Sequence, residues 1–258
     1  MRLIISPAKK MRVDLESGCA CTPPFFSSGN PAAAVLAPES LLRAAPDPVG
    51  LQPVPGGRKL GTAPADGSGK RRQPRLCWPM RESSTSTWLL RFFEDGQMDW
   101  VGERVRILSG FYGALRPFDR VVPYRLEMQA KLSGTRQMVD LQEKDLYAYW
   151  GDLLYQGTRD ADGVFINLAS REYAKAVEKY IAPADHFITV EFCEQVDGKL
   201  KQKGTFAKMA RGEMVRFLAE RNAETPEAAQ GFDRLGYRFS PAHSTAASYV
   251  FLREGRAN

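Results

Sequence analysis

Residues 18–93 limit what this chain can fold into more than any other feature, because they carry no helix or strand period. The segment holds 11 of the 17 prolines and three of the four cysteines of the chain. Its prolines would stop any helix that a run such as "PESLLRAAPDPVGLQPVPGG" could begin. Taken at face value it is a disordered, basic linker. The packed core must therefore come from the residues on either side.

The remaining composition is typical of a globular protein. Hydrophobic residues make up 43% of 258 residues, enough for one large domain or two small ones. The sequence has no run of about 18 apolar residues and its start, "MRLIISPAKK", lacks the layout of a signal peptide. With four cysteines a disulfide framework is not expected. We expect a cytoplasmic, reduced protein with no membrane partner, and leave its oligomeric state open.

The basic balance of the chain lies mainly in the odd segment. The net charge is +6, and a pI of about 9.2 usually favours nucleic acid as a partner. Residues 18–93 hold nine lysines and arginines against four acidic residues, which leaves 27 basic against 26 acidic residues elsewhere. The overall charge is therefore weak evidence for nucleic-acid binding.

The rest of the chain is well patterned. "RLIIS" predicts a buried strand, and "MDWVGERVRILSGFYGALRPFD" predicts a helix through Leu108 that breaks at Gly110 and Gly113. "KDLYAYWGDLLYQGTRD" predicts a second helix, and "GVFINLAS" with "REYAKAVEKY" predicts a strand–loop–helix unit. Towards the C-terminus the pattern predicts a hairpin over "HFITVEFCEQVDGKLKQKGTF", an amphipathic helix over "AKMARGEMVRFLAERN", a short helix from Pro226 and two strands, "GYRFS" and "SYVFLRE".

Common catalytic and metal-binding motifs are missing from the sequence. There are two histidines, His186 and His243, and no Cys-x-x-Cys pair. Cys193 alternates within the expected hairpin and fits a small apolar side chain better than a nucleophile. No Walker loop or Gly-x-Ser-x-Gly motif is present. We assign no catalytic residue, no metal ligand and no cofactor, and leave open whether the protein is an enzyme.

"SPAK" follows the first expected strand and places Ser6 and Lys9 at its tip, where binding sites often lie. A hydroxyl and an ammonium there could contact a ligand. The alternative is an ordinary turn with a solvated lysine.

"SGFYGALRPFDRVVPYRLEM" interleaves arginines with tyrosines, which could grip a phosphate and stack on a base. The alternative is a pair of structural ion pairs, Arg116 with Asp119 and Arg125 with Glu127. The candidate ligand-binding residues of this run are Tyr112, Arg116, Tyr124, Arg125 and Glu127.

Two further stretches place polar residues at a helix start and on a helix face. "INLASREY" offers Asn167, Ser170 and Tyr173 at a strand-to-helix junction, where backbone N–H groups can hold an anion. Ser170 could equally serve only as a helix cap. Lys208 and Arg211 share one helix face, which could form a phosphate-binding edge or a solvated surface.

Six motifs in one order resemble the YaaA family of bacterial peroxide stress proteins: "LIISPAK", "LSGFYGALRPFD", "PYRLEM", "KDLYAYWGD", "INLASREY" and "KMARGEMVRFLAE". The resemblance implies an α/β fold, a single domain over 1–258 in which a mixed sheet is wrapped by helices. It also implies a role in peroxide stress, DNA binding, restraint of free iron and functional roles for Ser6 and Lys9. The alternative is an enzyme that acts on a phosphate- or nucleobase-bearing small molecule through Lys9, Tyr112, Arg116 and Arg125.

The resemblance leaves out residues 18–93, where family members carry a helical, Leu-rich stretch of similar length. That stretch ends in something like "LLAYEGIQYQYMAP". Permitted codons for "LCWPMRESSTSTWLLR", read two nucleotides later, give that peptide, and the Trp and Met codons allow no choice. We hypothesise that two compensating frameshifts enclose residues 18–93. The family's DNA-reading helices would fall in this segment, so we expect weakened DNA binding. The alternative is a real Pro/Arg-rich insert.

Overall fold

The computed structural model describes residues 1–7, 94–119, 126–130, 144–196 and 198–254. Three candidate site residues and the whole of the odd segment lie outside this part of the chain: Lys9, Tyr124, Arg125 and 18–93. The predictions made for them are therefore not addressed by the structure.

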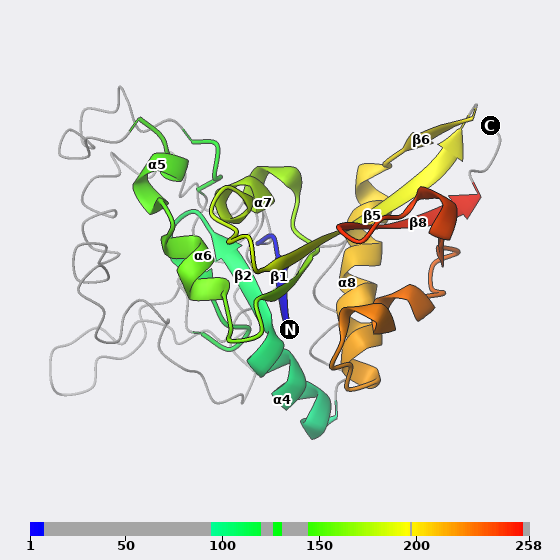
Figure 1. Cartoon of the computed structure of the whole chain (residues 1–258), viewed down its shortest axis with the longest axis horizontal. Helices are drawn as coiled ribbons and strands as arrows, with labels where there is room; N and C mark the ends of the chain where they lie inside the picture. Colours follow the sequence, from blue (N-terminus) through cyan, green and yellow to red (C-terminus); the bar gives the residue numbers. More distant parts are fainter. Residues whose placement is uncertain (8–93, 120–125, 131–143, 197, 255–258) are drawn as a thin grey trace, which may run out of the picture.

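The described residues form an α/β fold built on one mixed sheet of eight strands (Figure 1). The strand order is β3-β2-β1-β4-β5-β8-β7, and β6 pairs with β5 off this path. The five central strands from β2 to β8 run parallel, whereas β3, β6 and β7 are antiparallel to their neighbours. The strands are β1 (Arg2–Ile5), β2 (Val105–Ser109), β3 (Gly113–Leu115), β4 (Val164–Asn167), β5 (His186–Val196), β6 (Lys199–Lys201), β7 (Arg238–Phe239) and β8 (Ser248–Glu254).

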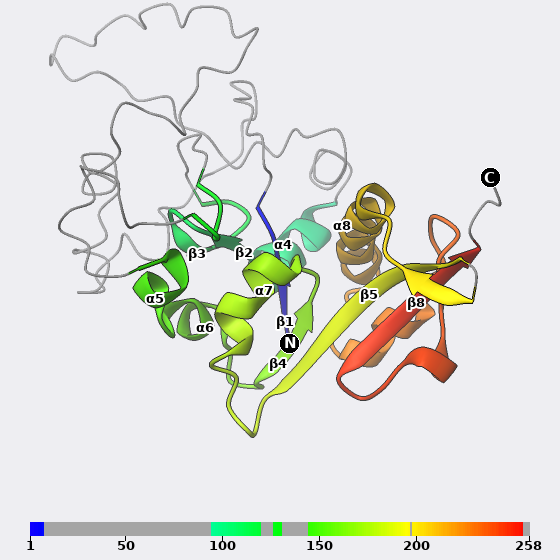
Figure 2. The same ribbon diagram turned by 90° about the horizontal axis from the view of Figure 1, so that it is seen from above.

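Helices cover both faces of the sheet, and each face has its own apolar cluster (Figure 2). One cluster joins sheet residues to α4 and α8, and the other joins them to α5, α6 and α7. The mixed sheet wrapped by helices confirms the expected fold class. The helices are α4 (Asp95–Arg104), α5 (Leu146–Trp150), α6 (Leu153–Thr158), α7 (Arg171–Glu178), α8 (Gly204–Glu220), and the 3-10 helices η2 (Pro226–Gly231) and η3 (Pro241–His243).

Strand β1 lies inside the sheet, between β2 and β4. Its side chains alternate between the two faces, so Leu3 enters the α4–α8 cluster and Ile4 enters the α5–α7 cluster. Burial on both faces explains the unbroken apolar run of this strand. Arg2 shares the face of Ile4, and Arg106 on β2 stands opposite Ile4 in register. Two arginines therefore flank the start of β1 on one face of the sheet.

The prediction of one helix through Leu108 is wrong after Arg104. Helix α4 ends there, and Val105 begins strand β2 with an extended backbone. Both the helical and the extended pattern bury Val105 and Leu108, so periodicity alone could not separate them. Parallel pairing with β1, in which Leu3 stands opposite Val105, selects the strand.

Most other predicted elements are confirmed. The strand–loop–helix unit corresponds to β4 and α7, the Asp-Gly hairpin to β5 and β6, and the amphipathic helix to α8. The helix predicted over "KDLYAYWGDLLYQGTRD" is two short helices, because Gly151 between α5 and α6 adopts a φ of 50°. That value is costly for a residue with a side chain, so glycine is suited to this break.

Candidate functional site

Short polar side chains gather where the parallel strands β1 and β4 end. Ser6 follows β1, and Ser170 follows β4 as the N-cap residue of α7. The Oγ of Ser6 accepts a hydrogen bond from the backbone N–H of Ser170 at 2.7 Å and lies 3.1 Å from the Oγ of Ser170. This geometry holds the loop before α7 against the tip of β1. Ser170 makes no side-chain cap bond within α7, so the simple capping role is not what the structure shows.

Asn167 and Ser109 complete this end of the sheet, and both are buried. The Oδ1 of Asn167 accepts a hydrogen bond from the N–H of Ala169 at 3.0 Å, and its Nδ2 donates to Thr189 at 3.3 Å. The Oγ of Ser109 accepts from the N–H groups of Phe111 and Tyr112. These side chains satisfy backbone groups where the strands turn into loops, which is what buried polar groups commonly do.

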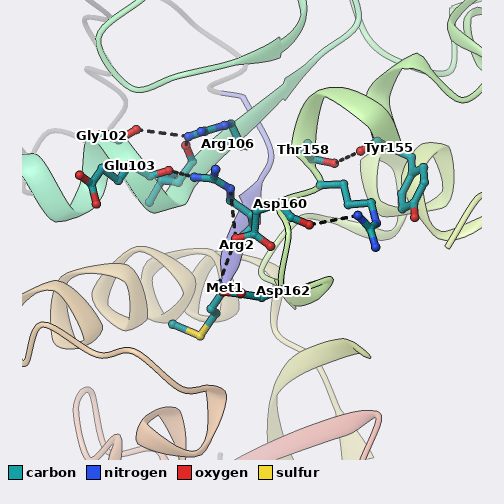
Figure 3. Close-up of polar contacts among 11 residues, drawn as sticks. Met1, Arg2, Gly102, Glu103, Arg106, Tyr155, Thr158, Asp160 and Asp162 are labelled. Atoms are coloured by element: carbon teal, nitrogen blue, oxygen red, sulfur yellow. Dashed lines mark hydrogen bonds and ion pairs between the residues drawn. The ribbon is translucent and has the colours of Figure 1, made fainter. Parts of the chain in front are cut away.

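A cavity of about 400 Å³ opens at the other end of β1. We call it the arginine pocket, because four arginines from β1, α4, β2 and the residue after β3 line it together with three carboxylates. Figure 3 shows Arg2 lying between Arg106 and Asp160. The lining residues are Met1, Arg2, Gly102, Glu103, Arg104, Arg106, Arg116, Asp160 and Asp162.

Two of these arginines cap the C-terminal end of α4. The Nη1 of Arg2 donates to the carbonyl of Glu103, and the Nη1 of Arg106 donates to the carbonyls of Gly102 at 3.2 Å and Val105 at 2.7 Å. The last carbonyls of a helix have no partner within it, and the helix dipole favours positive charge at that end. The capping bonds therefore fix the guanidinium groups in place.

Asp160 and Asp162 form the acidic side of the pocket. Each accepts a hydrogen bond from the amino group of Met1 at 3.1 Å. The Nε of Arg2 lies 3.4 Å from Oδ2 of Asp160. The other carboxylate oxygen of Asp160, Oδ1, is buried without a hydrogen-bond partner, as is the Nε of Arg104. The Nε of Arg2 is a third such atom, and none of the three is exposed to solvent.

The guanidinium group of Arg106 lies in an environment that disfavours its positive charge. Burial, followed by repulsion from Arg2 and Arg116, lowers its pKa to about 10. Asp119 and Asp160 act in the opposite direction but less strongly. The guanidinium remains charged at neutral pH, and an anion near it would be attracted by three arginines at once.

The structure brings together some of the predicted site residues and separates others. Ser6, Asn167 and Ser170 meet at the carboxyl end of β1 and β4, whereas Arg116 lines the pocket at the opposite end of β1. Its backbone N–H donates to Oδ2 of Asp119 at 2.8 Å, whereas the ion pair expected between the two side chains stays a prediction. Among the predicted site residues that the structure describes, Arg116 is the one that lines the arginine pocket.

The remaining predicted residues lie elsewhere. Tyr112 and Tyr173 are buried, and burial raises the pKa of the Tyr173 hydroxyl. Glu127 lies in the short described stretch 126–130. Lys208 and Arg211 belong to α8, where burial lowers the pKa of Arg211 and its Nε has no hydrogen-bond partner. Whether any of these residues contacts a ligand stays a prediction.

Sequence reasoning missed Arg2, Arg104, Arg106 and Asp160. The signal that could have found two of them is a basic residue near the start of each of two apolar strands, "RLII" and "VRIL". Within the described part of the chain, no group of three or more His, Cys, Asp or Glu side chains is placed to hold a metal ion. No helix among the same residues is long and apolar enough to cross a membrane.

Comparison with known proteins places the chain in a family. A family model described as peroxide stress protein YaaA matches residues 90–243. A protein of Lactiplantibacillus plantarum, named UPF0246 protein, is 40% identical over 264 residues, which cover 98% of this chain and 99% of that relative. This chain belongs to the YaaA family. The full-length match confirms the resemblance that the six motifs indicated.

Other YaaA-family relatives match a shorter part of the chain. A UPF0246 protein of Agathobacter rectalis is 52% identical over 162 residues, or 63% of each chain. One from Desulfitobacterium hafniense is 45% identical over 161 residues, or 62% of each chain. The matched part therefore spans less than two thirds of the length of these two relatives.

Proposed function

We propose that this YaaA-family chain acts in the cytoplasm in the bacterial response to peroxide stress, where it binds duplex DNA and limits the damage caused by free iron. The observation that carries the DNA-binding part is the arginine pocket. Four arginines from separate segments converge on one surface at the start of β1, and arginine is the side chain best suited to phosphate. Family membership supports the link to peroxide stress.

The contact chemistry fits a phosphate backbone better than base recognition. Carbonyl groups of α4 hold the guanidinium groups of Arg2 and Arg106 in place. The N–H groups that make no capping bond therefore have fixed positions. A guanidinium has five donors, and each capping Nη1 uses only part of that set. Contacts of this kind position a protein on DNA without reading sequence. We therefore expect binding with little sequence preference.

Salt dependence tests this proposal. Each neutralised phosphate contributes a slope of roughly −0.9 to the plot of log affinity against log salt. We expect the double variant Arg2→Gln, Arg106→Gln to lose slope by about 2 relative to the unaltered chain, measured by fluorescence anisotropy with a labelled duplex. Arg238→Gln is the matched control, because Arg238 is exposed on β7 at the far edge of the sheet. Equal slopes in all three proteins would contradict DNA binding through the pocket.

A further inference from the structure

We propose that the arginine pocket binds the terminal phosphate of a small phosphorylated molecule that carries hydroxyl groups next to the phosphate, such as a sugar phosphate or a nucleotide. The inference rests on the proposed function in one respect, since it uses the same pocket as a phosphate site. It goes further because it names a small ligand that would enter the pocket, whereas duplex DNA would lie across its opening.

The arginines supply the phosphate-binding half of the site. Within the described residues Arg106 makes hydrogen bonds to carbonyl groups only, and it lies near Arg2 and Arg116, both of which repel it. A dianionic phosphate between these groups would replace repulsion by charge-assisted hydrogen bonds. The planar fork of arginine can bind two phosphate oxygens at once. The arrangement is thus complementary to a compact anion.

The carboxylates supply the other half. Glu103, Asp160 and Asp162 also line the cavity, and ionised carboxylates accept hydrogen bonds. A small molecule with one terminal phosphate would place that phosphate among the arginines and its remaining part beside these acids. Hydroxyl groups on the same molecule could donate to these carboxylates, whereas the oxygens of a diester backbone carry no proton to donate.

The size and shape of the pocket support a small ligand. Its volume of about 400 Å³ lies within the range of about 300–1,000 Å³ found for small-molecule sites. The alternative explanation for these arginines is that Arg2 and Arg106 only cap the C-terminal end of α4 through their hydrogen bonds to its carbonyl groups. That role explains the capping bonds, but it does not require a cavity of this size, lined by further charged side chains, beside the helix end.

Isothermal titration calorimetry of the full chain with ribose 5-phosphate at neutral pH and fixed ionic strength tests the inference. We expect saturable binding of one molecule per chain, with ribose giving no heat and inorganic phosphate binding more weakly. Arg106→Lys keeps the charge but lacks the fork, so we expect a loss of affinity of at least about tenfold. Arg238→Gln, which removes one charge from an exposed arginine outside the pocket, is the control and should stay within about twofold of the unaltered chain.

A second pair of variants distinguishes a loss of ligand contacts from a loss of folding. Arg2→Lys changes a partly exposed side chain and should lose affinity in the same direction, with an unaltered melting temperature. Asp162→Asn removes an exposed negative charge at the rim and should bind ribose 5-phosphate more tightly by about two- to fivefold. Absence of saturable binding, or equal losses in Arg106→Lys and Arg238→Gln, would overturn the inference.

The same proteins separate this inference from DNA binding. If the chain binds the duplex through the pocket and shows no binding of ribose 5-phosphate, the inference is overturned and the proposed function stands. If ribose 5-phosphate binds and the duplex does not, the DNA-binding proposal fails and the pocket is a small-molecule site. If both bind, ribose 5-phosphate should compete with the duplex, and independent binding would contradict a shared site.

Discussion

Two clusters of buried charge in this molecule are organised in opposite ways. In the Glu194 cluster, formed by Glu194, Lys203 and Arg253, one fully buried carboxylate lies between two cations. Lys203 Nζ is 2.8 Å from Oε2 of Glu194, and Arg253 donates to Oε1. In the arginine pocket the cations outnumber the carboxylates, and Arg106 is repelled by its neighbours.

The difference indicates which cluster maintains the fold and which is available for a ligand. Buried charges are stable when each has a partner, as in the Glu194 cluster, which joins β5, β8 and the start of α8. A cluster that gathers like charges lowers stability and persists when another function requires it. The Glu194 cluster therefore has the features of a scaffold, and the arginine pocket has those of a binding site.

The largest expected effect is on stability at the Glu194 cluster. Glu194→Ala would remove the one carboxylate that both cations share, leaving Lys203 and Arg253 near each other without it. We expect the free energy of unfolding to fall by about 3–5 kcal/mol, measured by urea denaturation. The control is Glu254→Ala, which removes an exposed carboxylate from the end of the same strand as Arg253. A loss below about 1 kcal/mol in Glu194→Ala would show that this cluster is not a scaffold.

Acid should weaken the Glu194 cluster. The hydrogen bond from Lys203, together with Arg253, holds the pKa of Glu194 below its usual value. A carboxyl group with a lowered folded-state pKa stabilises the fold above its unfolded pKa of about 4.3 and loses that contribution as pH falls through the folded value. We expect the stability difference between the unaltered chain and Glu194→Gln to shrink as pH falls below about 4.3. A pH-independent difference would contradict the assignment.

The smallest expected effect is on stability at the arginine pocket. Arg106→Met would lose hydrogen bonds to two carbonyls, each contributing about 1 kcal/mol, and would also relieve repulsion from Arg2 and Arg116. Because the two terms oppose each other, we expect the free energy of unfolding to change by less than about 1 kcal/mol. Thermal and urea unfolding would measure it. A loss as large as that of Glu194→Ala would make Arg106 a scaffold residue as well.

Local patterns predicted much of the fold. "GVFINLAS" and the Asp-Gly turn between two alternating runs identified β4 and the β5–β6 hairpin, because periodicity and turn chemistry agreed. The stretch 105–109 could not be assigned in the same way, since its pairing with β1 joins segments about a hundred residues apart. Ser6 and Ser170 were found individually, but their hydrogen bond depends on the order of strands in the sheet.

The arginine pocket could not be predicted from spacing. Arg2, Arg106, Arg116 and Asp160 are brought together by β1, β2 and the loop before β4, and no motif joins them. Ligand sites of open α/β sheets are expected at the carboxyl ends of the parallel strands, whereas this pocket lies at the amino end of β1. Charges that converge from distant segments become visible only once the contacts between those segments are known.

Residues 18–93 remain subject to the frameshift hypothesis. Sequencing the coding DNA tests it directly: two compensating errors or lesions near the ends of the segment would support it, and an in-frame reading that still gives "RESSTSTWLL" would contradict it. We expect a frame-restored chain to bind duplex DNA more tightly than the present one.

Hydrogen–deuterium exchange with and without ribose 5-phosphate compares the two clusters in a single measurement. If the arginine pocket is the phosphate site, amide exchange should slow in residues 102–106 and 160–163, which surround it. Residues 194–203, which span the Glu194 cluster, should be unchanged. Slower exchange at 194–203, or none at 102–106 under saturating ligand, would contradict the assignment of the arginine pocket as the binding site.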